Sequence, residues 1–436
     1  MKNHFRTLAV SLTFLLLALT VQSRELIAGS GWQDESASDQ VSKAETLERL
    51  SNKTLALYKA ERYTEALPVA EKTLALAEEL FGRHHEVTAK SLNNLAQIHV
   101  VFGNRSEAEK MFLESIAITE KVSGRDHADI TPALKNLAAL YFFSSNFDKA
   151  EKYYRRLIEI EEQLTGKDHA DLTGPLESLA NVFEAQERFS EAIKLRERAL
   201  KIRERSIGEN SDGQKNDILG FARNAITRLW DNLAASLNNR ATSLVREGKL
   251  EEAEEPMKEA LSIREKHLGP DDSRTISTLK NLSILYMRLK MYAEAEPLYL
   301  RLLVISEDSL GKGSAEMVPE LLKMARLYKN LDRPEETAAM YERAISILGK
   351  APQNNAYPLA LLLNNLATHY TGWEKHEEAT ALYSRAVSVI KDYGIIENSE
   401  TLVIIQNALQ FFRQTGDDEK VAEIEKMLGI EPEPAD

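Results

Sequence analysis

The chain has 436 residues, of which 43% are hydrophobic and 28% charged, and its formal net charge is −13. This length allows two or three ordinary domains or one long repeat array, and the composition excludes a disordered chain. An acidic surface disfavours nucleic acid and anionic lipid as main ligands. Cysteine is absent, which excludes disulfides, thiolate zinc sites and cysteine nucleophiles.

The first 23 residues have the pattern of an export signal. Lys2 and Arg6 precede an apolar run at 8–21, and small residues at Val21 and Ser23 offer a cleavage site. The run is short for a membrane span, which needs about 20 apolar residues. We therefore expect a periplasmic or secreted protein, with an uncleaved membrane anchor as the alternative. Residues 24–43 are rich in Ser, Gly, Asp and Gln and are predicted to be a flexible linker.

A 42-residue period begins after this segment and extends over residues 44–428. Glycines recur at this spacing, and so do segments of the type "LNNLA" and "LKNLA". Only one interval differs, at 61 residues. The central polar residue of each segment, here called the anchor, is in turn Asn94, Asn136, Ser178, Asn239, Asn281, Lys323 and Asn365.

Each unit contains two amphipathic helical patterns separated by a short polar turn. A small residue fourteen positions after the anchor would let the two helices approach closely, and a large or aromatic residue four positions later would fill the gap between them. The small residues are Ala108, Ala150, Ala192, Ala253, Ala295, Thr337 and Ala379. The first unit is predicted to have a turn one residue shorter than the others, the last unit is irregular, and both fit the caps of a repeat array.

The period, the "NNLA…Y" and "EAExLYxRAL" helices and the "GxDH" joints at Gly124 and Gly166 resemble the tetratricopeptide repeats of kinesin light chain. The resemblance covers about residues 44–428 and implies an all-α, right-handed α-solenoid of about nine helix pairs. It implies little about function, because an export signal is foreign to a cytosolic motor subunit. Residues 429–436, which follow the repeats, are predicted to be an acidic tail.

The 61-residue interval contains an insertion at about 209–228. Apolar residues there follow helical spacing, so the fifth unit's first helix either starts early or is preceded by a separate short helix. The insertion either packs on the neighbouring unit or protrudes as an apolar helix for self-association or partner docking. Trp230 would be the anchor of such a contact.

The resemblance implies that the anchor asparagines point into a concave groove and hydrogen-bond an extended peptide. A carboxamide offers the donors and the acceptor that a peptide backbone requires. Bonding to neighbouring helices of the same array is the alternative, and Ser178 and Lys323 interrupt the series. The predicted peptide-binding asparagines are Asn94, Asn136, Asn239, Asn281, Asn365 and Asn407.

The residues beside the anchors change character along the chain. Early units carry Val100, Val101, Phe142 and Phe143, whereas later ones carry Lys280, Lys323 and Lys329 together with the predicted site residues Arg246, Arg288 and Arg326. Cations gathered on one face of an acidic protein favour an acidic peptide or a C-terminal carboxylate as ligand. The alternative is a solvated face paired with nearby acids.

No catalytic pattern is present: the sequence has no nucleophile elbow, HExxH or Walker loop. His85, His127 and His169 also recur, but a repeat spacing separates them too far for one metal ion, and we expect them to position the next helix. The sequence thus predicts no enzyme, cofactor, metal or small-molecule substrate. It favours a scaffold that binds a protein or peptide partner, or alternatively a self-assembling structural element, and a homo-oligomer is possible.

Overall fold

The structure is a computed structural model that describes residues 35–210, 216–396 and 399–429. These residues form 18 α-helices and three short 3-10 helices and contain no strand. The chain is therefore the predicted all-α solenoid, with nine helix pairs in its described part. It divides into two compact units, residues 1–240 (unit 1) and residues 241–436 (unit 2). The predicted signal at 1–23 and the tail beyond Gly429 lie outside the described residues.

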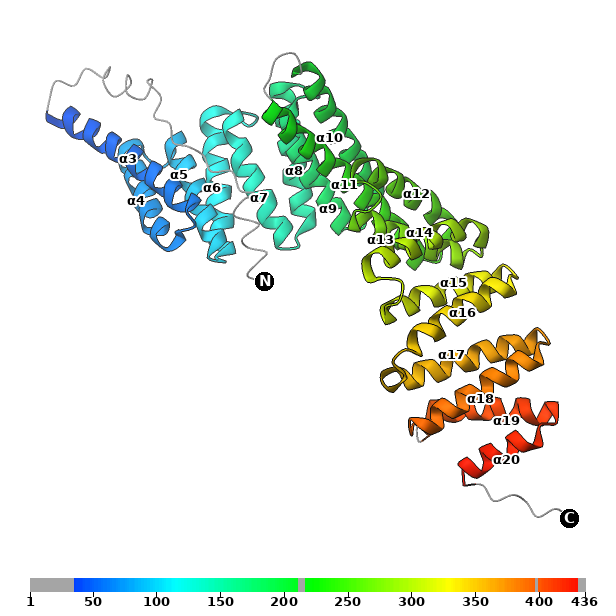
Figure 1. The fold of residues 1–436 in the computed structure, drawn as a ribbon. Helices are drawn as coiled ribbons and strands as arrows, with labels where there is room; N and C mark the ends of the chain where they lie inside the picture. Colours follow the sequence, from blue (N-terminus) through cyan, green and yellow to red (C-terminus); the bar gives the residue numbers. More distant parts are fainter. Residues whose placement is uncertain (1–34, 211–215, 397–398, 430–436) are drawn as a thin grey trace. The chain divides into compact units, whose positions relative to one another are not determined.

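Unit 1 contains four complete helix pairs that follow one another in chain order (Figure 1). Its helices are α3 (Glu35–Lys59), α4 (Tyr63–Phe81), α5 (Glu86–Val101), α6 (Arg105–Ser123), α7 (Thr131–Phe143), α8 (Phe147–Thr165), α9 (Thr173–Ala185) and α10 (Phe189–Asn210), with 3-10 turns η1 (Ala128–Ile130) and η2 (Ala170–Leu172). Helix α11 (Asn216–Arg246) begins in this unit and ends in unit 2.

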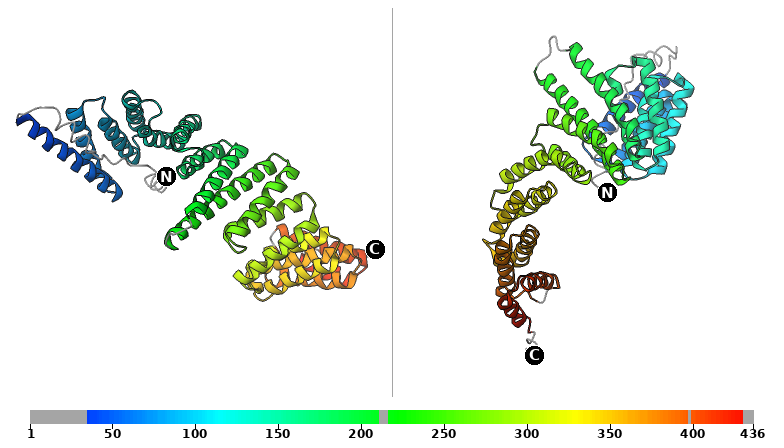
Figure 2. Two further views of the ribbon diagram at one scale, coloured as in Figure 1. Left: turned by 90° about the horizontal axis from the view of Figure 1, so that it is seen from above. Right: turned by 90° about the vertical axis from the view of Figure 1, so that its right-hand side faces the viewer.

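Unit 2 repeats the same arrangement, and the views of Figure 2 show its helices stacked in the same chain order. Its helices are α12 (Leu250–His267), α13 (Ser273–Arg288), α14 (Tyr292–Leu310), α15 (Val318–Asn330), α16 (Pro334–Leu348), α17 (Pro352–Gly372), α18 (His376–Asp392), α19 (Ser399–Thr415) and α20 (Asp418–Met427), with the 3-10 turn η3 (Ala315–Met317). Odd-numbered helices are the first helices of the pairs, and even-numbered helices are the second.

The turn inside each pair contains one residue with a left-handed backbone. These residues are Glu61, Gly103, Ser145, Glu187, Gly248, Lys290, Asp332, Glu374 and Gly416. At Ser145, the Asn146 N–H donates to the Tyr141 carbonyl at 2.9 Å, and the Ser145 N–H donates to Phe142 at 3.0 Å. This bonding closes the end of α7 and offsets the strain of a non-glycine residue there. Glu61 precedes Gly103 by a full period, so the prediction of a shorter first turn is wrong.

The core follows the predicted small and large positions. The seven small residues from Ala108 to Ala379 have no exposed surface, and Phe112 of α6 is equally buried. Tyr154, Met257, Tyr299 and Tyr383, which occupy the same position in other pairs, are at most 7% exposed. Close approach of two helices at a small side chain, with a large neighbour filling the space, therefore holds each pair together.

The structure corrects one predicted boundary, that of the linker, and decides between the two alternatives for the insertion. Helix α3 already begins at Glu35, so residues 35–43 are helical and not linker; an ion pair between Asp39 and Lys43 supports this first part of the helix. The insertion lengthens α11 to 31 residues, whereas α5 and α9 have 16 and 13. The first helix of the fifth pair thus starts early, and no separate short helix precedes it in the described residues.

Candidate functional site

The first helices of unit 2 carry a stripe of exposed residues. On α13, Lys280, Ile284 and Arg288 are exposed, and on α15 Arg326 and Lys329 are exposed. Residues three or four apart lie on the same side of a helix, so each helix presents its exposed residues on one face. The stripe is not purely polar, since Ile284 is 52% exposed. The sequence placed Arg288 and Arg326 on such a face, and the structure does so too.

Most of the cations of this stripe have no carboxylate partner within the described residues. We call Lys280, Arg288, Arg326 and Lys329 the basic row; none of them forms an ion pair in this part of the chain. Lys323, between them, is bonded to Glu320 at 2.8 Å. The basic row therefore retains its charge for a ligand, which favours the ligand interpretation over the paired surface for these four residues.

Arg246 lies on another helix than the basic row, at the exposed end of α11. The pKa of the adjacent Glu247 is lowered, mainly by a hydrogen bond from Lys249 at 2.8 Å and to a smaller extent by the charge of Arg246. This predicted site residue thus has an acidic neighbour, unlike Arg288 and Arg326.

An aromatic cluster that the sequence analysis missed adjoins the basic row. The ring of His369 on α17 stacks on Trp373 with centroids 5.6 Å apart and contacts Tyr341 of α16 at 5.5 Å. Burial lowers the pKa of His369, and the charge of Lys329 lowers it further. The latter effect places the Lys329 ammonium near this cluster. All of these side chains are half-buried, except Lys329, which is exposed.

The anchor asparagines of unit 2 bond to one another through a residue that the prediction omitted. Asn407 Nδ2 of α19 donates to Asn364 Oδ1 of α17 at 3.1 Å, and Asn364 Nδ2 donates to Asn365 Oδ1 at 3.3 Å. Asn365 and Asn407 are half-buried. Bonding within the array, the alternative to peptide binding, is therefore realised at these two anchors, although each amide keeps further hydrogen-bonding capacity.

Unit 1 has the same bridge between α5 and α7. Asn136 Nδ2 donates to Asn93 Oδ1 at 3.0 Å, and Asn93 Nδ2 approaches Asn94 Oδ1 at 3.5 Å. Asn94 and Asn136 are both buried. In both units the acceptor is the first asparagine of an "NN" pair. It precedes its donor in the sequence by one full period plus one residue. The doubled "NN" in the sequence is the signal for this bridge. The predicted peptide-binding residues include only the second asparagine of each pair.

The fourth and fifth pairs replace the amide bridge with buried charges. Arg196 of α10 is 3% exposed and donates to Asn181 Oδ1 at 2.6 Å and to Glu184 Oε2 at 3.0 Å, both on α9. It also donates to Ser236 of α11. Burial alone would raise the pKa of Glu184, but the bonds and charge of Arg196 outweigh it and keep that pKa low.

The same network fixes the position of α11 along α9. Asn239 Nδ2 donates to Glu184 at 3.3 Å, and Asn232 Nδ2 donates to Glu177 at 2.8 Å. In a regular repeat Asn239 would meet Glu177, so α11 is displaced by seven residues, which is two turns or about 10.5 Å. The predicted site residue Asn239 is exposed and has an acidic partner, whereas Asn281 on α13 is half-buried. The displacement itself could not be predicted from the repeat pattern.

The predicted apolar flank lies on α5 and α7 of unit 1. Val100 is buried and Val101 half-buried, while Phe143 is 39% exposed. The ring of Phe142 contacts those of Phe143 and Phe147 at 5.2 and 5.9 Å between centroids. Unit 1 therefore exposes aromatic surface at the ends of its first helices.

The three recurring histidines begin helices, as predicted. His85, His127 and His169 accept the backbone N–H two residues ahead through Nδ1, at 3.2, 3.3 and 3.4 Å. Across the described residues, no group of three or more His, Asp or Glu side chains could hold a metal ion. Among the same residues, no helix is both long and apolar enough to cross a bilayer.

The fold is similar to several solved structures, though only distantly. A Podosopora anserina putative kinesin light chain with nearly identical TPR-like repeats is 18% identical, covers 52% of this chain and 98% of its own, and has a TM-score of 0.36. For BtubC (BKLC) from P. vanneervenii the values are 24%, 57%, 89% and 0.32. For the apo form of RapI they are 14%, 88%, 96% and 0.39.

The search of curated proteins found no match. The family model described as Tetratricopeptide repeat matches residues 46–121, 103–163, 129–205 and 232–308, which together are more than half of the chain. These matches include the pairs that carry the histidine caps and the first part of the basic row. The chain belongs to the tetratricopeptide repeat family.

Proposed function

We propose that this tetratricopeptide scaffold holds an extended, acidic segment of a partner protein against the first helices of unit 2. The observation that carries the proposal is the basic row, whose four cations lack carboxylate partners within the described residues. The protein as a whole is acidic, with a formal net charge of −13. The basic row attracts an acidic peptide, whereas the rest of this acidic protein repels it. Electrostatics therefore favour binding of an acidic segment at this face.

The spacing of the helices suits an extended chain. Packed helices lie about 8–10 Å apart, and an extended peptide advances about 3.3 Å per residue. A peptide running across α13 and α15 would therefore meet a new pair of cations about every third residue. The guanidinium groups of Arg288 and Arg326 would bind carboxylates by paired hydrogen bonds. Ile284 and the His369 cluster offer apolar contact beside these charges.

A selection from a random peptide library displayed on phage tests the proposal without a known partner. The chain should enrich peptides rich in Asp and Glu at low salt. The double variant Arg288→Glu, Arg326→Glu should lose this enrichment. The matched control Lys266→Glu, Lys426→Glu makes the same change in net charge at exposed lysines of second helices and should keep it. Enrichment of acid-poor peptides, or equal selection by the double variant, would rule the proposal out.

We also propose that the protein acts in the periplasm or outside the cell. The support is the export signal predicted at residues 1–23. Fusing residues 1–30 to an alkaline phosphatase that lacks its own signal tests this, because that enzyme is active only after export. Phosphatase activity is expected, and replacing the apolar run at 8–21 by polar residues should abolish it. An inactive fusion protein that is expressed at normal level would contradict export.

A further inference from the structure

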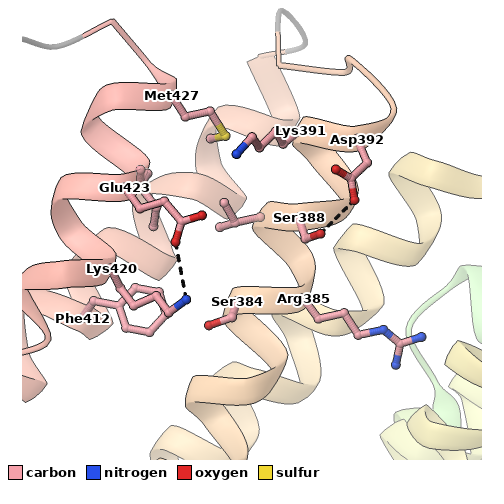
Figure 3. Close-up of a pocket in the computed structure, with 11 residues that line it drawn as sticks. Ser384, Arg385, Ser388, Lys391, Asp392, Phe412, Lys420, Glu423 and Met427 are labelled. Atoms are coloured by element: carbon pink, nitrogen blue, oxygen red, sulfur yellow. Dashed lines mark hydrogen bonds and ion pairs between the residues drawn. The ribbon is translucent and has the colours of Figure 1, made fainter.

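Within the described residues, the last helix of unit 2 is shorter than the helix against which it packs. Helix α20 has ten residues, whereas α18 has 17 and the other second helices of this unit have 15 to 19. Beside α20, a cavity of about 400 Å³ lies between α18, the end of α19 and α20 (Figure 3). It involves second helices and is distinct from the basic row on α13 and α15.

The cavity combines an apolar floor with a polar rim. The floor consists of Val387 from α18, Phe412 from α19 and Ile424 and Met427 from α20. The rim carries two hydroxyl groups and two ammonium groups. These belong to Ser384, Ser388, Lys391 and Lys420. In Figure 3 the ammonium group of Lys391 lies beside Met427, that of Lys420 lies at the other end of α20 with the Glu423 carboxylate between them, and the side chain of Arg385 points away from the cavity.

The acidic residues of the rim already have partners. Asp392 accepts a hydrogen bond from Ser388 at 2.9 Å, and Glu423 accepts one from Lys420 at 3.4 Å. Lys391 has no ion pair within the described residues. The Lys420–Glu423 pair is long and exposed, so it is weak and a stronger acceptor can displace it. The rim therefore offers one unpaired and one loosely paired cation above an apolar floor.

We propose that this cavity binds a small monocarboxylate with an apolar chain. Its volume of about 400 Å³ lies in the range of roughly 300–1,000 Å³ that is usual for small-molecule pockets, which suits a short aliphatic acid. A carboxylate beside Lys391, the cation without an ion pair, forms charge-assisted hydrogen bonds, Lys420 adds a second positive charge to the rim, and the chain of the ligand covers Val387 and Ile424. The three helices that enclose the cavity leave space for no more than one or two residues of a peptide.

Titration of the full chain with octanoate, followed by NMR of ¹³C-labelled methionine methyl groups, tests this directly. The methyl group of Met427 lines the cavity and should shift saturably, and a Met427→Leu variant assigns its signal. Octan-1-ol and octylammonium have the same chain without a carboxylate and should bind at least about fivefold more weakly, since each lacks the charge-assisted bonds.

Two variants link binding to the rim. Lys391→Gln combined with Lys420→Gln should weaken octanoate binding by at least about tenfold, whereas Lys426→Gln, on the same helix but outside the cavity lining, should leave it unchanged. A Met427 signal that does not shift, or that shifts equally in the double variant or with octan-1-ol, would overturn the proposal. So would binding of an acetyl-Leu-Glu-amide probe in preference to octanoate, because the ligand would then be peptidic.

Discussion

The two units share one backbone plan but differ at equivalent positions of their first helices. Seven residues after the anchor, unit 1 has Val101 and Phe143, whereas unit 2 has Arg246 and Arg288. The helix, its turn and its buried small residue are the same in both units. The repeat therefore specifies the fold through its buried positions, while the exposed positions are free to take different ligand chemistry in each unit.

The loops between pairs also differ between the units. The residue that begins the next helix has the same role toward the backbone in both units, but its side chain differs. In unit 1 the residue that begins the next helix is His85, His127 or His169, whereas in unit 2 it is Asp272 or Ser314, and α17 follows Ala351 without a side-chain cap. All five accept the N–H two residues ahead. Among these three residue types, only the imidazole group has an ordinary pKa near neutral pH. The units should therefore differ in their response to pH as well as in their ligands.

The largest effect is expected at the buried charges of unit 1. Arg196→Met leaves Glu177 and Glu184 half-enclosed without their cation, so the free energy of unfolding should fall by about 3–5 kcal/mol. Arg198→Met on the same helix removes a half-buried, solvent-accessible pair with Glu162 and should cost clearly less, about 1 kcal/mol. Chemical denaturation measures both. Equal losses would show that burial of Arg196 does not distinguish this region.

The asparagine bridge is the feature that both units share, and double-mutant cycles can test whether it is equivalent. The pairs are Asn93 with Asn136 in unit 1 and Asn364 with Asn407 in unit 2. Each alanine cycle should give a coupling energy of about 1 kcal/mol, as for a partly buried neutral hydrogen bond. Coupling in one unit alone would mean that the bridge is not a common element of the repeat.

The histidine caps predict that unit 1 loses stability in mild acid. Burial lowers the pKa of His85, and Lys90 lowers it further, while Glu86 acts in the opposite direction. Because the folded pKa lies below the unfolded value of about 6.5, the unfolded chain binds the proton first as pH falls. The free energy of unfolding should therefore decrease from about pH 7 downwards until the folded pKa is passed.

The variant His85→Asp keeps an acceptor at this cap and removes its titration near neutral pH. Its stability should change less than that of the unchanged chain between pH 7 and pH 5, measured by denaturation at each pH. The reverse change in unit 2, Asp272→His, should introduce a new loss over the same interval. Identical pH profiles for all three chains would refute the difference between the caps.

The smallest effect concerns the insertion at the end of unit 1. If the long α11 serves only to pack within the array, deleting residues 212–228 should change the sedimentation coefficient no more than the lost mass requires. A chain that sediments as an oligomer before the deletion and as a monomer after it would instead support the alternative of self-assembly through this segment.

The sequence predicted the features that repeat and missed those that occur once. The period located the nine pairs, the buried Ala108 series and the histidine caps, because each follows from a position shared by every unit. Arg196 stands four residues after Ala192, where most other pairs have a large apolar or aromatic residue, so the period places it inside its pair, but its partner Ser236 on α11 could not be predicted. The two-turn displacement of α11 likewise depends on contacts between distant residues. The start of α3 at Glu35 was not predicted, because the first residues of this helix are polar and show no helical period.

Reversal of the charges in unit 2 tests the central claim most directly. Binding of a fluorescent decapeptide of alternating Glu and Ala to the chain should weaken by at least about tenfold in the double variant Arg288→Glu, Arg326→Glu, and the variant should instead bind the peptide of alternating Lys and Ala. The exchange of preference is what the basic row predicts. If the variant binds both peptides as the unchanged chain does, the basic row is not the peptide-binding surface.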